Sequence, residues 1–491
     1  MPIDDTQFQT LKKTARSFIQ KQENDECLRE DFLNSLLALP LTIEQRIELL
    51  DQQEGNGSTL GMTVARYGHE AAVQQYLVHH SIILSGLHQD GKDILLALAL
   101  LMKKTATGWT LGHYIAHYQS SQVVQQYIAL LIHLLQAEAS GHNIMELCKL
   151  QTNDGWTVGH LIARYHDTAT MQAYFKLLND LLAAGTPAQD ILALFKLQTN
   201  DGWTVGHIIA YNHDAATVQA YFKLLNDLLA ASDSAQDILE LLKLQTNDGW
   251  TVGHQIASYH DTATAQAYFK LLNDLLAAGI PAQDILELFK LQTNDGWTVG
   301  HLIARYHDTA TMQAYFKLLN NLLAAGTPAQ DILALFKLQT NDGWWTVGRQ
   351  IACYHDATTA QAYFKLLNDL LAAGIPAQDI LELFKPQMQT SDGRTVGHII
   401  NSCQNAAMHS YYHKIEKEVE VNQKYAHTHF HGASFFSAEF AKTFSSSYPK
   451  RNPSSTEQRW SINSADPLSE SKSESDAFLL DLKKDTPIFS L

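Results

Sequence analysis

Apolar and polar residues follow the 3.6-residue period of an α-helix along most of the chain, and the alternation typical of β-strands does not occur. In one representative stretch, Thr157 can cap a short helix whose buried side carries Ile162 and Ala163 and which ends near His166. The pattern predicts an all-α protein.

A longer second helix is expected to begin at Asp167 or Thr168 and to end at Gly185, because a glycine commonly lies just beyond a helix end. A short third helix comes next. Residues 186–189, Thr-Pro-Ala-Gln, have the form of a capping box with proline at the first helical position. The apolar positions of the second and third helices are Met171, Tyr174, Phe175, Leu178, Leu181, Leu182, Ile191, Leu192 and Phe195.

This three-helix pattern is one copy of an internal repeat. Its period of 47 residues is the spacing of the tryptophans Trp156, Trp203, Trp250 and Trp297. Residues 200–202, Asn-Asp-Gly, predict the turn between copies, and weaker copies of the motif begin at Thr59, Thr110 and Thr395. A single copy cannot bury its own apolar stripe, so successive copies are expected to stack into a solenoid.

The run from Asp154 to Tyr165 resembles the first half of an ankyrin repeat, whose signature is Thr-Pro-Leu-His-x-Ala. Thr157, His160 and Ala163 match this signature, whereas Val and Gly replace its Pro and Leu. The period exceeds the roughly 33 residues of an ankyrin repeat by about one helix. An armadillo or HEAT solenoid is the nearest alternative fold, and the Asp-Gly turn favours ankyrin.

The resemblance implies an ankyrin-like α-solenoid of about eight repeats with three helices each. We expect residues 1–52 to form a helical N-terminal cap and residues 53–400 the repeat array. Residues 401–431 are expected to form a C-terminal capping helix and a His-rich segment. Residues 432–491 have the Ser-rich composition of a flexible tail.

Ankyrin arrays are known chiefly as protein-binding scaffolds, and the resemblance implies that role. The partner surface would comprise turn residues and the exposed side of the first helix, where aromatic residues and arginine are typical of interfaces. The alternative is that the tryptophans and tyrosines pack between repeats. The expected partner-binding residues are Trp156, Val158, Leu161, Arg164, Tyr165, Tyr211, Tyr259, Arg305, Tyr306 and Tyr354.

Composition narrows the classes of partner. The formal net charge of −16 at pH 7 argues against binding to nucleic acid or to anionic membranes. The longest apolar run, Ile94 to Met102, is shorter than the roughly 20 residues that span a bilayer. The N-terminus lacks a Sec-type signal, and the 4 cysteines form no CxxC pair, which is typical of the cytoplasm.

The charged residues of the helices suggest a solvated face. Lysines recur on the second helices, mostly with an aspartate four residues later, as in Lys176 and Asp180. We therefore expect ordinary ion pairs rather than a basic stripe for nucleic acid.

A column of histidines recurs with the repeat, at His113, His160, His207, His254, His301 and His398. Packed helices lie about 8–10 Å apart, too far for equivalent imidazoles to share a zinc ion. The ankyrin resemblance implies instead that each histidine bonds to the threonine and to turn backbone. Arg349 replaces the histidine beside Trp344 and Trp345, so a local irregularity is expected there.

Histidines also cluster outside the repeats. His427, His429 and His431 are candidate metal ligands, because imidazole-rich tracts bind zinc, copper or nickel. Alignment with the second helix places His409 and His413 on the outer face of a terminal helix. A metal-dependent or enzymatic activity in residues 400–450 is therefore an alternative function. No catalytic motif and no cofactor site is recognised.

The C-terminal tail is similar to the export signals of type IV secreted bacterial effectors, with a polar Ser/Glu composition and an apolar residue near the end. This resemblance implies a host protein as partner and Sec-independent secretion into the host cell. A scaffold that is not secreted remains the other alternative.

Overall fold

The computed structural model describes residues 3–20, 26–90, 94–137, 140–232, 234–343 and 345–384, together with positions 409–411, 413, 414 and 417. The chain divides into two units, residues 1–428 and 429–491, and all described residues belong to the first. The regular elements of this part are α-helices, with an isolated β-bridge between Gln53 and Thr59, so the predicted all-α class is confirmed for it. Expectations for His398, His427, His429, His431 and the tail 432–491 concern residues outside this description.

Each period of the repeat contains a first, a second and a third helix. The first helices are α4 (Leu60–Tyr67), α7 (Leu111–Tyr118), α10 (Val158–Tyr165), α13 (Val205–Asn212), α16 (Val252–Tyr259), α19 (Val299–Tyr306) and α22 (Val347–Tyr354). The second helices are α5 (Glu70–Gln89), α8 (Ser121–Gln136), α11 (Thr168–Ala183), α14 (Ala215–Ala231), α17 (Thr262–Ala277), α20 (Thr309–Ala324) and α23 (Ala357–Ala372). The third helices are α6 (Leu95–Met102), α9 (Gly141–Lys149), α12 (Ala188–Lys196), α15 (Ala235–Lys243), α18 (Ala282–Lys290), α21 (Ala329–Lys337) and α24 (Ala377–Glu382).

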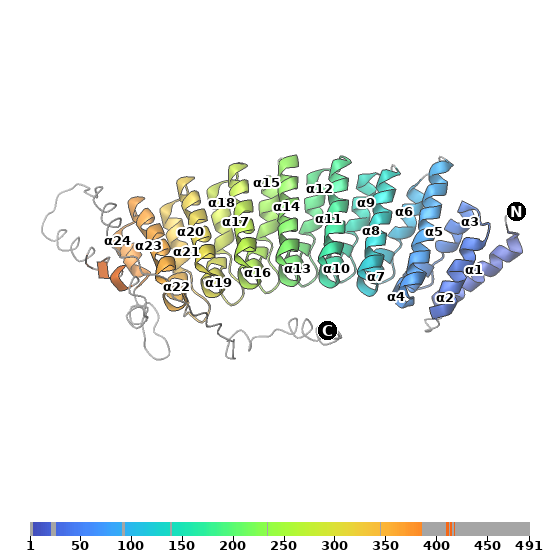
Figure 1. Cartoon of the computed structure of the whole chain (residues 1–491), viewed down its shortest axis with the longest axis horizontal. Helices are drawn as coiled ribbons and strands as arrows, with labels where there is room; N and C mark the ends of the chain where they lie inside the picture. Colours follow the sequence, from blue (N-terminus) through green and yellow to red (C-terminus); the bar gives the residue numbers. More distant parts are fainter. Residues whose placement is uncertain are drawn as a thin grey trace, which may run out of the picture. The chain divides into compact units, whose positions relative to one another are not determined.

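Helices of the same rank pack on one another from repeat to repeat, as Figure 1 shows for α10, α13 and α16 along one side. Before the first copy, α1 (Asp5–Gln20), α2 (Glu26–Ala38) and α3 (Ile43–Leu50) pack on α4, α5 and α6 respectively. Thr42 caps α3 with a capping box, and these three helices lie within residues 1–52, where a helical cap is predicted. This packing of equivalent helices in successive repeats is the solenoid arrangement that the repeat predicts.

Most helix ends lie where the sequence predicts them. Thr157 accepts a hydrogen bond from the N–H of His160, and Asp167 caps α11 by accepting from the N–H of Thr170 at 2.9 Å. Gly185 follows α11 with a φ of 89°, a left-handed conformation that glycine adopts without strain.

The capping box predicted at residues 186–189 is wrong. Helix α12 begins at Ala188, and its N-cap Pro187 offers no side-chain cap. The N–H of Thr186 donates to the carbonyl of Leu181 and closes the turn that ends α11. Thr186 therefore belongs to the preceding turn and lies one residue too early to cap the third helix.

The glycine of the Thr-Val-Gly-His motif allows close contact between the first two helices. A Cβ on Gly159 would lie 2.7 Å from Oη of Tyr174, and the same relation links Gly206 to Tyr221. The tyrosine rings are fully buried in the core. This contact explains why glycine stands where the ankyrin signature has leucine.

The irregularity predicted near Arg349 is present in the turn before α22 and at the cap of that helix, which lacks the capping box of α10, α13, α16 and α19. The N–H of Thr340 donates to the carbonyl of Trp345, one residue later than the equivalent bond from Thr199 to Trp203. The additional residue is accommodated before α22, and the guanidinium carbon of Arg349 lies 4.7 Å from the Trp345 ring centre.

Candidate functional site

The predicted histidine column fixes the turn side of five first helices, α7, α10, α13, α16 and α19. Nε2 of His160 lies 3.1 Å from the carbonyl oxygen of Trp203 in the next repeat, and because a carbonyl only accepts, Nε2 carries the proton. Nδ1 then accepts from the N–H of Thr157 at 3.2 Å. The same bonds hold His113, His207, His254 and His301, which confirms their structural role.

These imidazoles are neutral at pH 7. Burial lowers the pKa of each of His113, His160, His207, His254 and His301 to about 4. Within the described residues, no group of at least three His, Cys, Asp or Glu side chains is arranged to hold a metal ion.

A second histidine column, which was not predicted from the sequence, fixes the other end of four first helices, α7, α10, α13 and α19. Nε2 of His213 donates to the carbonyl of Ala163 in the preceding repeat at 2.8 Å. Equivalent bonds are made by His166, His260 and His355. The recurrence of these residues just after the first helix was visible in the sequence, but their carbonyl partners were not.

The turns between repeats are also joined to one another. The N–H of Asn200 donates to the carbonyl of Asp154, and Nε2 of Gln198 donates to the carbonyls of Gly202 and Gln245. The turns therefore form a hydrogen-bonded row, and the side chain of Asp154 is exposed at its tip.

Aromatic side chains form a band on the first helices, consisting of the tyrosines at the helix ends and the tryptophans of the turns. Tyr118, Tyr165, Tyr259, Tyr306 and Tyr354 are each 41–54% exposed. The tryptophans Trp109, Trp156, Trp203, Trp250 and Trp297 are partly buried and pack against the core. We call these residues, with Tyr211, Trp345 and the arginines between them, the aromatic band.

Contacts within the band cross five of the six junctions between described first helices in the same way. The next-to-last residue of a first helix contacts the last residue of the first helix in the following repeat. These pairs are Arg66 with Tyr118, His117 with Tyr165, Arg164 with Asn212, Tyr211 with Tyr259, and Arg305 with Tyr354.

The structure places eight of the ten predicted partner-binding residues on this surface. Tyr165, Tyr259, Tyr306 and Tyr354 are exposed, and Trp156, Arg164, Tyr211 and Arg305 are partly exposed. Tyr118, which was not among the predicted residues, takes the same place in a more divergent copy.

Val158 and Leu161 were wrongly predicted to be exposed, because they are only 6% and 3% exposed. The cause is packing between neighbouring first helices. A methyl carbon of Val158 lies 3.0 Å from where a Cβ on Gly112 would stand.

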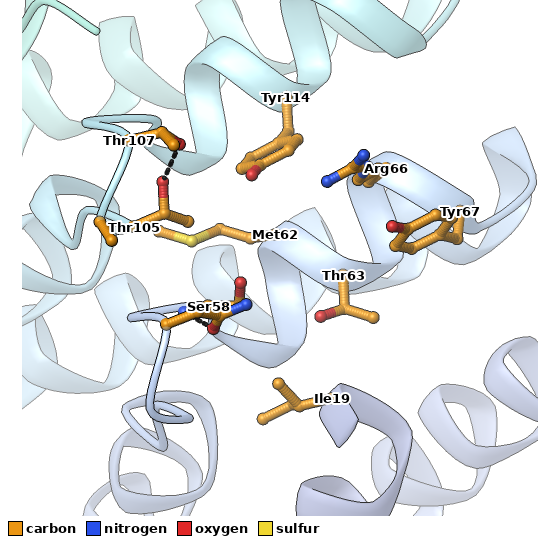
Figure 2. A pocket seen from close by; sticks show the side chains of 11 residues that line it. Ile19, Ser58, Met62, Thr63, Arg66, Tyr67, Thr105, Thr107 and Tyr114 are labelled. Carbon is orange, nitrogen blue, oxygen red and sulfur yellow. Dashed lines mark hydrogen bonds between the residues drawn. The ribbon is translucent and has the colours of Figure 1, made fainter. Parts of the chain in front are cut away.

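A pocket of about 170 Å³ lies beside the band at its N-terminal end (Figure 2). Met62, Arg66, Thr105 and Tyr114 contribute to its wall. The residues that line it include hydroxyl groups and one guanidinium but no carboxylate, imidazole or thiol. Arg66 is the one charged residue of this lining, which also includes Tyr67 and Tyr114.

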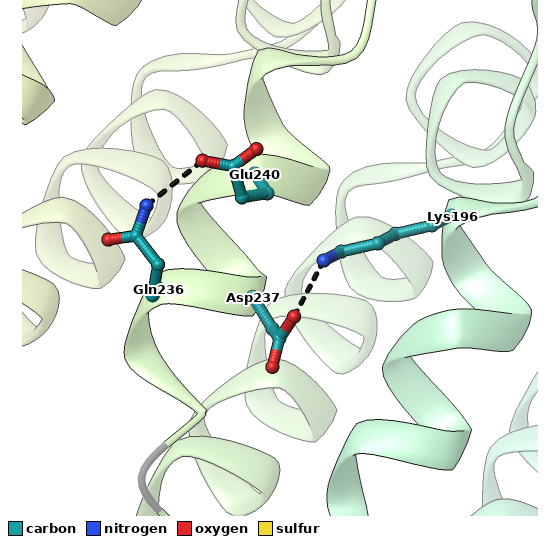
Figure 3. A network of polar contacts seen from close by, with 4 residues as sticks. All are labelled: Lys196, Gln236, Asp237 and Glu240. Atoms are coloured by element: carbon teal, nitrogen blue, oxygen red, sulfur yellow. Dashed lines mark hydrogen bonds and ion pairs between the residues drawn. The ribbon is translucent and has the colours of Figure 1, made fainter.

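The opposite, outer side carries paired charges, as predicted. Nζ of Lys176 lies 2.6 Å from Oδ2 of Asp180 four residues later. Figure 3 shows Lys196 of α12 paired with Asp237 of α15 at 2.7 Å. Such exposed pairs contribute little to stability, so this side is an ordinary solvated surface.

The residues described between 409 and 417 are helical and continue the stack. The ring of Tyr411 stacks on Phe364 with centroids 3.9 Å apart, and its hydroxyl donates to Asn368. His409 is exposed and His413 partly exposed, with their Nε2 atoms 3.3 Å apart. The predicted alignment with a second helix is confirmed at Tyr411.

No protein-family model matches the chain, and no curated protein matches it. Among the described residues, no helix is both long enough and apolar enough to cross a membrane.

Proposed function

We propose that the repeat array is an ankyrin-like scaffold that binds a partner protein through the aromatic band. The exposure of the last tyrosine in five of the seven first helices, which lie in one row, carries this proposal. Tyrosine, tryptophan and arginine dominate binding energy at protein interfaces because they bury a large area and retain a polar group.

The rigidity of the support favours this function. Both ends of α7, α10, α13 and α19 are tied to neighbouring repeats by imidazole bonds such as those of His160 and His213. A surface that is ordered before binding loses less conformational entropy when the partner arrives. The band is thus suited to recognition rather than to a mobile catalytic centre.

The near identity of the copies also argues for binding. Trp156–Gly202 and Trp297–Gly343 differ only at Asp180 and Asn321. An active site needs unlike groups that converge at one place, whereas duplicated copies present the same groups many times.

A capture experiment with a surface variant tests the scaffold. In the band variant, Tyr118, Tyr165, Tyr259, Tyr306 and Tyr354 are each changed to Ser. In the control variant, serine replaces four lysines on the outer side, Lys176, Lys223, Lys270 and Lys365. We expect the unaltered protein and the control to retain one common partner from a eukaryotic cell lysate and the band variant to lose it. Equal retention by both variants, with both folded by circular dichroism, would refute the proposal.

The proposal that this scaffold acts in a host cell after secretion rests on the tail sequence alone. A reporter fused to residues 432–491 should be translocated by a type IV system, and removal of those residues should abolish the transfer. Failure of transfer would leave the scaffold proposal intact and favour action in the cell that makes the protein.

A further inference from the structure

The part of the aromatic band on α13 and α16 differs in charge from the rest. Residues 199–214 and 246–261, which form these helices and their flanking turns, contain four aspartates and neither lysine nor arginine. The next-to-last residue of the first helix is an arginine in α10 and α19. It is Tyr211 in α13 and Ser258 in α16. We call the surface of these two segments the central window.

Aromatic rings form a continuous group within the central window. The centroids of Trp203 and Tyr211 lie 5.6 Å apart, and Tyr211 meets Tyr259 edge-on at 5.1 Å across the junction. Trp250 stacks on Tyr259 at 6.2 Å, and Tyr259 is 54% exposed. Because the faces of such rings attract cations, this group favours a positively charged ligand.

Elsewhere in the band the protein supplies that cation itself. The guanidinium carbon of Arg305 lies 4.3 Å from the ring centre of Tyr354, and that of Arg66 lies 5.0 Å from the ring centre of Tyr67. At the border of the window, Arg164 donates to the side-chain oxygen of Asn212 at 3.2 Å. The chain thus already contains the cation–aromatic contact that a basic partner would make in the window.

Carboxylates lie on both sides of the window. Asp201 and Asp248 belong to the turns, and Asp214 and Asp261 cap the second helices. Hydrogen bonds from Thr217 and Thr264 lower the pKa of the two capping carboxyl groups, so both are ionised at neutral pH. The surroundings of the rings are therefore negative, which complements a basic partner.

The spacing of the helices limits the form of that partner. Helix α13 packs directly on α16, and packed helices lie about 8–10 Å apart. Three residues of a polyproline II segment advance by about 9 Å. A chain in this conformation that crosses the first helices therefore presents every third side chain to successive repeats.

We propose that the central window binds an extended basic segment of the partner protein, with arginine or lysine at every third residue. This inference rests on the scaffold function and specifies the chemistry of its ligand. The cations would lie on the rings of Tyr211 and Tyr259, between the two rows of aspartates.

Binding of labelled synthetic peptides, followed by fluorescence anisotropy, tests this proposal. The probe consists of repeated Pro-Pro-Arg triplets, and its control has the same composition with all arginines in one block. We expect the triplet peptide to bind at least about tenfold more tightly than the block peptide. Equal affinity would show that charge alone is recognised and would overturn the proposal.

A pair of variants tests the location of the site. Ser258→Arg places in α16 the residue that α10 and α19 have at the same position, so the fold should tolerate it. It should weaken triplet binding by about tenfold or more. Ser258→Gln adds a neutral side chain of similar reach and should leave affinity within about twofold. No effect of Ser258→Arg, or equal weakening by both substitutions, would contradict the proposal.

These outcomes are separable from those of the scaffold test. If the band variant loses its captured partner but the triplet peptide does not bind the unaltered protein, the scaffold function stands and the basic segment is wrong. If the band variant retains its partner like the control, the scaffold function itself fails.

Discussion

His207 illustrates how one side chain can both satisfy a turn and join two repeats. Its ring accepts from the N–H of Thr204 and donates to the carbonyl of Trp250 in the following copy. These two hydrogen bonds require a neutral imidazole with its proton on Nε2. Protonation would turn the acceptor Nδ1 into a donor facing another donor.

The histidine column therefore predicts a loss of stability in mild acid. The pKa of His207 is about 4 in the folded protein against a reference value of 6.5. The unfolded chain binds the additional proton first, so stability is complete above pH 6.5 and decreases as the pH falls toward 4. Each such histidine contributes a slope of up to about 1.4 kcal/mol per pH unit in this interval.

Urea denaturation between pH 7 and pH 5 measures this slope, and His207→Gln provides the comparison. The variant should be less stable at pH 7. The pH slope of its free energy of unfolding should be smaller, by the amount that corresponds to about one proton. Carboxylates such as Asp214 titrate mostly below this range and do not obscure it. An unchanged slope in the variant would show that His207 does not titrate as described.

Residue-level prediction succeeded where partners are close in sequence and failed where they are not. The Thr157–His160 pair lies within one turn of helix, so a known motif revealed it. The bond from His213 to Ala163 joins residues 50 positions apart, and its acceptor is a backbone group common to every residue. Burial of Val158 likewise depends on Gly112 in another copy.

At the scale of the element, the distance between first and second helices depends on a glycine facing a tyrosine. In α13 and α14 these are Gly206 and Tyr221. Alanine at Gly206 would raise helix propensity by about 1 kcal/mol if nothing else changed. Its Cβ would nevertheless lie 2.6 Å from Oη of Tyr221, so helix separation must increase.

Gly206→Ala is therefore expected to destabilise α13 by about 1–3 kcal/mol despite the gain in propensity. Tyr221→Phe should restore part of this loss, because it removes the nearest atom, a hydroxyl with no hydrogen-bond partner among the described residues. Hydrogen exchange of the α13 amides in both single variants and the double variant measures the coupling. Additive effects would exclude the proposed overlap.

Most element boundaries could be predicted because the caps follow local rules. Asp167 and Gly185 lie at the ends of α11 as the sequence indicates. The start of α12 was misjudged because Thr186 satisfies two patterns, a helix cap and the end of a preceding turn, and only the folded backbone distinguishes them.

At the scale of the whole array, stability depends on junctions between like helices. The 47-residue period predicted stacking because a lone copy leaves its apolar stripe exposed. The period could not predict which exposed residues form the band, since that depends on where the neighbouring copies lie. Tyr165, Tyr259, Tyr306 and Tyr354 are exposed, as a surface role requires, whereas Leu161 is buried.

The equivalence of the copies predicts that the array tolerates removal of whole periods. Deletion of residues 156–296 joins Gly155 to Trp297 and removes three periods of 47 residues. The helices that then pack on α7, α8 and α9 are α19, α20 and α21, which match α10, α11 and α12 except for Asn321 in place of Asp180. His113 can donate to the carbonyl of Trp297 as it does to that of Trp156.

The shortened protein should remain helical and fold cooperatively, with a lower melting temperature because fewer junctions stabilise it. It also lacks the central window, so the triplet peptide should no longer bind, although Arg305 and Tyr354 remain in the band. Circular dichroism and peptide anisotropy on the same preparation separate the two effects. A folded deletion variant that still binds the peptide would place the basic segment elsewhere, and an unfolded one would show that the junctions are not interchangeable.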